Sequence, residues 1–298
     1  MDLVGTVLAT AAGLLLIGLA GRDIFDALFH PEGRGTLARL LARGVWLAFR
    51  RARPGPRAFA LAGPVGLLVV IACWAALLAF GWALVYLPHL SEGFSGTSEG
   101  GHDWVDALNI SLVTLTTVGF GDVVPAADWL RLATPLEALL GFGLLSASIS
   151  WLLLIYPVLA RRRSLAYEIR LLRDADEEEP GALEHLKGEP AERLYQELTS
   201  RLIAVERDLV NYPITYYFAE ADERFSLPAV APYMLDLAER GTADTSGHVR
   251  LRARLLRKAI EDFAATTASG FHGMAGATTE ELLHAYARDH LRANAPRA

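Results

Sequence analysis

The sequence predicts an all-α membrane protein with three spanning helices and a helical domain after them. Of its 298 residues, 52% are hydrophobic, a larger share than a soluble domain of this size usually carries. Three runs are each long enough to cross a bilayer, which takes roughly 20 apolar residues. Beyond residue 160, apolar residues instead recur at helical spacing among many charged ones.

The first run, Leu3 to Gly21, has no charged residue. A short apolar N-terminal run is also typical of a signal peptide, but this one lacks a basic segment at its start and a small-residue cleavage site before Arg22. We therefore expect an uncleaved transmembrane helix over 1–21.

The second run, between residues 58 and 88, is apolar on every face, which argues against a soluble amphipathic helix. It predicts a spanning helix over 64–88. The third run lies between Glu137 and Arg161 and predicts a spanning helix over 131–160.

Charge asymmetry orients these spans. Eight arginines lie between Arg22 and Arg57, and three more follow the last span, whereas no Lys or Arg occurs from residue 58 to 130. Positive residues favour the cytoplasmic side. We therefore expect a multi-pass protein of the cell membrane with its N-terminus outside and its C-terminus in the cytoplasm.

This orientation requires the segment between the second and third spans to enter the membrane and return on the same side. A short helix is expected over 103–116 with Asp103 as its N-cap, followed by the extended backbone of TVGFG, 117–121. Non-helical backbone at membrane depth is tolerated only where protein buries it or water lines it. Alternating glycines allow unusual backbone angles, so that consecutive carbonyls can face one side. Four chains around an axis would stack rings of carbonyl oxygens that replace the hydration shell of K⁺.

The run DALNISLVTLTTVGFGDVVP resembles the pore loops of potassium channels, in particular those of the tandem-pore subfamily and of small bacterial channels. The resemblance covers about a third of the chain, residues 64–160. It implies a pore-loop potassium channel module, with an outer helix over 64–88 and an inner helix over 131–160. The whole fold is then this module with an extra N-terminal transmembrane helix and a cytoplasmic helical domain, assembled as a homotetramer.

The resemblance also assigns roles to residues of the loop. It implies that the filter binds K⁺ through backbone carbonyls and one hydroxyl, that of Thr117; the carbonyls are those of Thr117, Val118, Gly119 and Phe120. Thr116, Gly121 and Asp122 would support this filter. Phe120 replaces the more common Tyr, and Asn109 and Ile110 replace aromatic residues that pack around the filter in many relatives.

Three residues of the inner helix are gating candidates. Gly141 and Gly143 are expected to act either as hinges or as points of close packing against the pore helix. Pro157 either kinks the helix or ends it before the arginines. Glu137, near the outer end of this span, is expected to be hydrogen-bonded behind the filter or hydrated at the interface.

The linker over 22–63 is basic but does not carry arginines at every third position, so we do not expect a voltage sensor. It is better explained by an amphipathic helix on the inner membrane surface, with Trp46 among the lipid headgroups and the arginines near anionic lipid. Asp23 and Asp26 are expected to be hydrated interface residues, and the alternative for them is pH sensing or ion binding.

The region 161–298 is expected to form a cytoplasmic helical domain. Two apolar stripes recur at helical spacing and should be buried; they comprise Leu194, Leu198, Leu202, Val205 and Leu209, and Leu256, Ile260 and Phe263. The run DADEEEPG, from Asp174, is expected to be an exposed linker rather than a ring of cation-binding acids. The domain either responds to an unidentified ligand or assembles the tetramer.

Other functional classes lack support. The sequence contains no HExxH, CxxC or GxSxG, so we predict no enzyme activity and no organic cofactor, with K⁺ as the transported ion. The net charge of −6 gives no case for a nucleic-acid partner. We expect a potassium-selective channel. The alternatives are a pore-forming subunit of a potassium uptake transporter and a membrane-anchored interaction protein.

Overall fold

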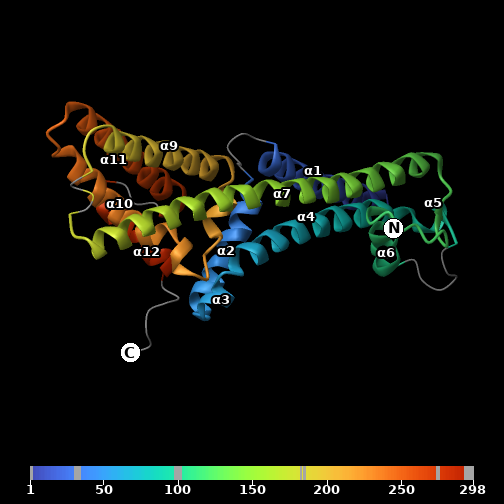
Figure 1. Cartoon of the computed structure of the whole chain (residues 1–298). Coiled ribbons are helices and arrows are strands. Elements are labelled where there is room, and N and C mark those ends of the chain that lie inside the picture. Colours follow the sequence, from blue (N-terminus) through green and yellow to red (C-terminus); the bar gives the residue numbers. More distant parts are fainter. Residues whose placement is uncertain are drawn as a thin grey trace. The chain divides into compact units, whose positions relative to one another are not determined.

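The computed structural model describes residues 3–29, 35–96, 103–181, 183, 186–272 and 276–291 (Figure 1). The chain forms two compact units, one of residues 1–41 and 67–153 and the other of residues 42–66 and 154–298. Within the described residues, three helical segments are long and apolar enough to cross a membrane: Leu3–Leu28, Pro56–Gly93 and Asp128–Glu178. This agrees with the number of spans expected from hydropathy.

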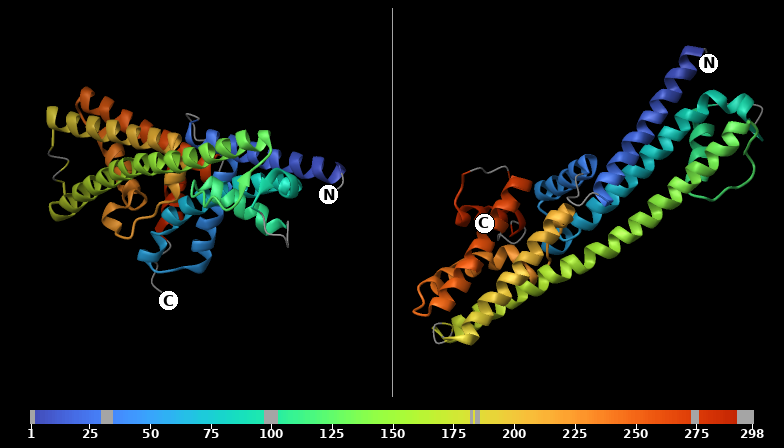
Figure 2. Two further views of the ribbon diagram at one scale, coloured as in Figure 1. Left: turned by 90° about the vertical axis from the view of Figure 1, so that its right-hand side faces the viewer. Right: turned by 90° about the horizontal axis from the view of Figure 1, so that it is seen from above.

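The first unit is mostly helical. Its elements, some of which continue into the second unit, are α1 (Leu3–Leu28), α4 (Ala62–Tyr86), η1 (Leu87–His89), α5 (Leu90–Gly93), β1 (Phe94–Ser95), α6 (Trp104–Leu115), β2 (Val124–Pro125) and α7 (Asp128–Glu178). Helices α1 and α4 run alongside one another (Figure 2). Glycines make this possible, because a Cβ added at Gly13 would lie 2.4 Å from the carbonyl oxygen of Gly81.

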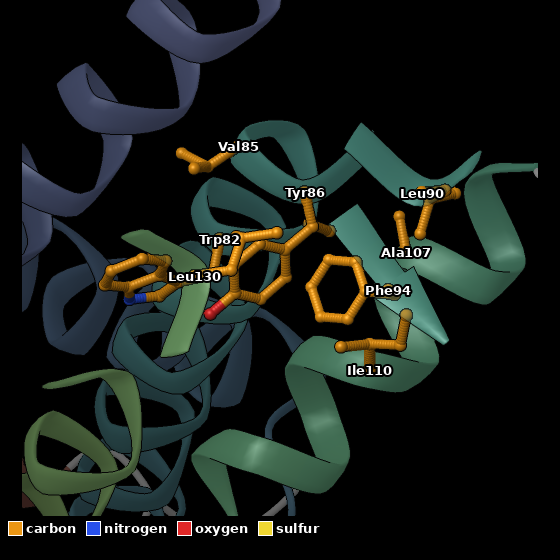
Figure 3. Packing of buried hydrophobic residues seen from close by; sticks show 9 residues of the cluster. Trp82, Val85, Tyr86, Leu90, Phe94, Ala107, Ile110 and Leu130 are labelled. Carbon is orange, nitrogen blue, oxygen red and sulfur yellow. The ribbon is translucent and has the colours of Figure 1, made fainter. Parts of the chain in front are cut away.

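A cluster of buried residues holds the C-terminal end of α4 against α6 and the start of α7 (Figure 3). The ring of Tyr86 lies between two other aromatic rings, 5.6 Å from Trp82 and 5.3 Å from Phe94 between centroids. Ile110 of α6 and Leu130 of α7 complete the cluster. Ile110 thus packs where we expected relatives to carry an aromatic residue, while Asn109 is exposed.

A two-stranded antiparallel pairing, which the sequence did not predict, anchors the chain after TVGFG. Phe94 pairs with Pro125, and Ser95 pairs with Val124. Gly96 follows with φ 93°, and a Cβ there would lie 1.9 Å from the carbonyl oxygen of Asp122. Glycine is needed at this position for both its backbone angle and its close approach.

Asp23 is buried, which corrects the expectation of a hydrated interface residue. Its carboxylate accepts hydrogen bonds from the backbone N–H groups of Leu37 at 2.8 Å and Ala38 at 3.1 Å, and from Trp74 Nε1 at 2.8 Å. Leu37 and Ala38 belong to the first turn of α2 (Thr36–Ala52), whose N–H groups have no partner within the helix. Asp23 therefore caps α2 from α1, and these donors offset the cost of burying its charge.

The second unit is a helical domain. Its further elements are α3 (Pro56–Phe59), α9 (Glu189–Asn211), η2 (Pro213–Tyr217), η3 (Glu223–Phe225), α10 (Leu227–Thr242), α11 (Gly247–Thr267), η4 (Ala268–His272) and α12 (Thr279–Leu291). Helix α9 packs on α11, and α10 packs on α11 and α12. Both predicted stripes face this core, and only Leu194 among their residues is half-buried rather than buried.

Helix α7 does not end at residue 160, and the acidic run from Asp174 is not a linker, because α7 continues to Glu178. Pro157 accordingly lies inside the helix. The part of α7 after residue 160 has an apolar face, and its residues Leu165, Ala166 and Ile169 are buried in the second unit. Near its end, Asp176 pairs with Arg240 at 2.8 Å.

Trp46 is buried in the second unit, so its expected place among lipid headgroups is wrong. Its indole N–H donates to Asp289 of α12 at 3.3 Å, and its ring lies 5.9 Å from Tyr217 and 5.0 Å from His290 between centroids. Asp289 also pairs with Arg50. The face of α2 that carries Trp46 and Arg50 therefore packs within the second unit.

Candidate functional site

The short helix α6 begins as predicted. Asp103 has extended backbone, and its carboxylate accepts from the N–H groups of Val105 at 2.9 Å and Asp106 at 3.2 Å. Such an N-cap satisfies donors that the helix leaves unpaired. Trp104 stacks on Phe80 of α4 with 5.8 Å between ring centroids.

The backbone after α6 folds back onto the end of that helix. The N–H of Thr117 donates to the carbonyl oxygen of Thr114 at 2.9 Å, and those of Val118 and Gly119 point at the carbonyl oxygen of Val113, at 3.0 and 3.4 Å. In a trans peptide group the C=O points opposite to the N–H, and no peptide bond among the described residues is cis. The carbonyls of Thr116, Thr117 and Val118 therefore point away from the end of α6.

The same segment alternates its backbone conformation. Thr117, Gly119 and Gly121 have φ angles of 59°, 57° and 78°, in the left-handed region. Glycine adopts this region readily, but for a β-branched residue such as Thr117 it is uncommon and strained. Strain of this kind concentrates at functional sites.

The segment 116–122 is exposed in the single chain. Val118 is 56% exposed and Phe120 is 71% exposed. The Asp122 carboxylate accepts a hydrogen bond from the N–H of Val123 at 3.0 Å. A cavity of about 330 Å³ lies beside the segment; residues lining it include Thr117, Gly119, Ile110, Val113, Thr114, Thr134, Pro135 and Ala138.

Helix α7 supports α6 at two points one turn apart. Glu137 is fully buried, and its carboxyl group lies 2.5 Å from Ser111 Oγ and 2.6 Å from Tyr86 Oη. One turn further on, a Cβ added at Gly141 would lie 1.8 Å from the carbonyl oxygen of Leu115. Gly141 therefore packs closely against the end of α6.

The other two gating candidates are placed differently. A Cβ at Gly143 would meet nothing within 4 Å in the single chain. Pro157 belongs to the second unit. Tyr86 and Ser111 were not among the site residues predicted from the sequence, although an acid inside an apolar helix is itself a signal that polar partners lie nearby.

Comparisons with known proteins place the site inside a stretch that matches an ion channel family. A family model described as "Ion channel" matches residues 72–154. The "Uncharacterized membrane protein YdjJ" of Bacillus subtilis (strain 168) is 26% identical over 160 residues, which cover 53% of this chain and 47% of that protein. "Two-pore potassium channel 5" of Arabidopsis thaliana is 39% identical over 49 residues, which cover 16% of this chain and 12% of that protein.

The chain spans less than half the length of either relative. No solved structure matches it. The family model assigns an ion channel domain to residues 72–154, in a chain with three helical segments long and apolar enough to cross a membrane among its described residues.

Proposed function

We propose that this protein is a potassium-selective channel that conducts K⁺ passively through a filter formed by residues 117–121 of four identical chains. The backbone after α6 carries the proposal. Its N–H groups donate to carbonyl oxygens of α6, and the carbonyls of Thr116, Thr117 and Val118 point away from that helix. Carbonyls gathered around an axis bind a dehydrated K⁺ ion, and adjacent sites let ions move in single file.

The exposure of the filter segment supports the tetramer. A single chain supplies a quarter of each carbonyl ring, and closed rotational symmetry is the usual way in which identical chains complete such a site. Val118 and Phe120 are then covered by neighbouring copies rather than by water or lipid, which explains why apolar side chains stand exposed in one chain. The similarity to a plant potassium channel over 49 residues adds support for the choice of ion.

We further propose that the helical domain is cytoplasmic and gates the pore through α7. Three successive arginines of α7 are fixed to that domain. Arg161 Nε donates to Asp208 at 2.7 Å, Arg163 Nε donates to Glu220 at 2.8 Å, and Arg162 donates to Glu220 at 3.2 Å and to two backbone carbonyls at 2.8 and 2.5 Å. Because these residues lie on the helix that also contacts α6, a displacement of the domain would reach the pore.

The filter is tested by K⁺ and Na⁺ flux into liposomes that contain the purified protein and its Gly119→Ala variant. A side chain at φ 57° costs about 1–2 kcal/mol and shifts the filter backbone. We expect selective K⁺ flux in the wild type and its loss in the variant, with the oligomer intact.

Gly18→Ala is the matched control, because a Cβ at this helical glycine of α1 would meet nothing within 4 Å. It should conduct as the wild type does. Selective flux that survives Gly119→Ala would refute the filter assignment, and equal K⁺ and Na⁺ flux in the wild type would refute the choice of ion.

A further inference from the structure

Glu137, Ser111 and Tyr86 form a buried polar group that joins three helices. Each of the three residues is fully buried. Glu137 comes from α7, Ser111 from α6 and Tyr86 from α4. The partners described for the carboxyl group are these two hydroxyls, and no cationic side chain is among them. Burial of a carboxylate without a cation is costly, whereas burial of a neutral carboxylic acid whose hydrogen bonds are satisfied costs far less.

The hydrogen count of Ser111 decides between these two forms. Its Oγ lies 2.5 Å from one oxygen of Glu137 and 3.0 Å from the backbone carbonyl oxygen of Ala79 in α4. A hydroxyl has one hydrogen to donate. If Ser111 donates to the carboxyl group, its contact with the Ala79 carbonyl joins two acceptors without a hydrogen. If Ser111 donates to Ala79, the carboxyl group must carry a proton and donate to Ser111.

We propose that Glu137 is a neutral carboxylic acid that positions the filter by donating a hydrogen bond to Ser111 while it accepts one from Tyr86. Each contact then has one donor and one acceptor: Tyr86 donates to Glu137, Glu137 donates to Ser111, and Ser111 donates to the carbonyl oxygen of Ala79. This inference rests on the proposed function, since the filter is what the chain of hydrogen bonds would position.

The hydrogen bonds of Glu137, Ser111 and Tyr86 matter for conduction because of where Ser111 lies on α6. Ser111 is held by Glu137, and Leu115, one turn later on α6, is in close contact with Gly141, one turn later on α7. Two contacts at matching spacing fix both the height and the rotation of α6. The filter N–H groups bond to carbonyls of Val113 and Thr114, which lie between these two contacts. A shift of α6 would therefore move the filter backbone with it.

Two substitutions separate the neutral acid from a carboxylate. Glu137→Gln keeps one acceptor for Tyr86 and one donor for Ser111, so it reproduces the pattern of the neutral acid. We expect its K⁺/Na⁺ permeability ratio in liposomes to match that of the wild type, because the hydrogen-bond pattern is unchanged. Glu137→Leu has a similar volume but no hydrogen bond, and we expect its ratio to fall by about tenfold. An impaired Glu137→Gln beside a selective wild type would overturn the proposal.

Infrared spectroscopy of the full chain tests the protonation directly, whether or not the variants conduct. The wild type should show the C=O stretching band of a protonated carboxylic acid at neutral pH. Glu137→Gln should lose that band, and Asp128→Asn, which changes an exposed acid at the start of α7, should keep it. If the wild type and Glu137→Gln do not differ in this band, the proposal is wrong. A wild type that shows the band but passes no K⁺ would refute the proposed function instead.

Discussion

Gly141 shows how one atom limits what a position tolerates. A Cβ there would lie 1.8 Å from the carbonyl oxygen of Leu115, and this obstacle is backbone rather than a flexible side chain. The two glycines at 141 and 143 look alike in the sequence, but at Gly143 the added atom would meet nothing within 4 Å. Which glycine permits the close approach depends on the rotation of α7 against α6, which the sequence alone does not give.

We predict that Gly141→Ala lowers stability by about 1–3 kcal/mol and reduces K⁺ flux, because the pore helix must shift to admit the methyl group. Thermal unfolding in detergent and liposome flux measure the two effects. Gly143→Ala should change stability little, since its methyl group is free of contacts in the chain. Equal stability of the two variants would show that α6 and α7 do not approach as closely as described.

At the scale of elements, the cap that Asp23 places on α2 links segments that hydropathy assigns to separate regions. Three donors surround its carboxylate, one of them the indole of Trp74 in α4. Asp23→Asn keeps one acceptor oxygen but turns an NH₂ group toward a remaining donor. We predict a loss of about 1–3 kcal/mol in the free energy of unfolding, measured by denaturant titration.

Asp26→Asn is the matched control for that experiment. Asp26 lies one turn away and pairs with Arg22 at 3.6 Å, where the arginine is 81% exposed. Such surface pairs contribute about 0–1 kcal/mol. A loss at Asp26 as large as that at Asp23 would argue against the capping role.

Elements were predictable from sequence where one physical signal dominates. Hydropathy found the spans, Asp103 marked the start of α6, and the periodic stripes such as Leu256 identified buried faces. Prediction failed where tertiary contacts decide. Pro157 was expected either to kink the helix or to end it, and the inner helix was expected to end at residue 160, but α7 continues because its later residues are buried in the second unit. Trp46 suggested a lipid headgroup contact, but Asp289 is its partner, far away in the sequence.

At the scale of the whole molecule, Arg162 and Arg163 share one carboxylate but differ in burial. The side chain of Arg162 is 9% exposed and that of Arg163 is 44% exposed, and both contact Glu220. Removal of a partner from a buried pair costs about 3–5 kcal/mol, whereas an exposed pair contributes about 0–1 kcal/mol.

We therefore predict that Arg162→Met destabilises the helical domain and changes the open probability of single channels, with the K⁺/Na⁺ permeability ratio unchanged. Arg163→Gln should have a much smaller effect on both stability and open probability. Single-channel recording and thermal unfolding of both variants provide the comparison. A changed permeability ratio in Arg162→Met would contradict the separation of filter from gate.

The contact between Trp46 and Asp289 joins residues that lie 243 positions apart. During synthesis, α2 leaves the ribosome long before α12, because α4, α6 and α7 lie between them in the sequence. The indole of Trp46 and the guanidinium of Arg50 therefore contact Asp289 only after α12, the last described helix, has been synthesised. The helical domain can therefore close around Trp46 only after α12 has been made.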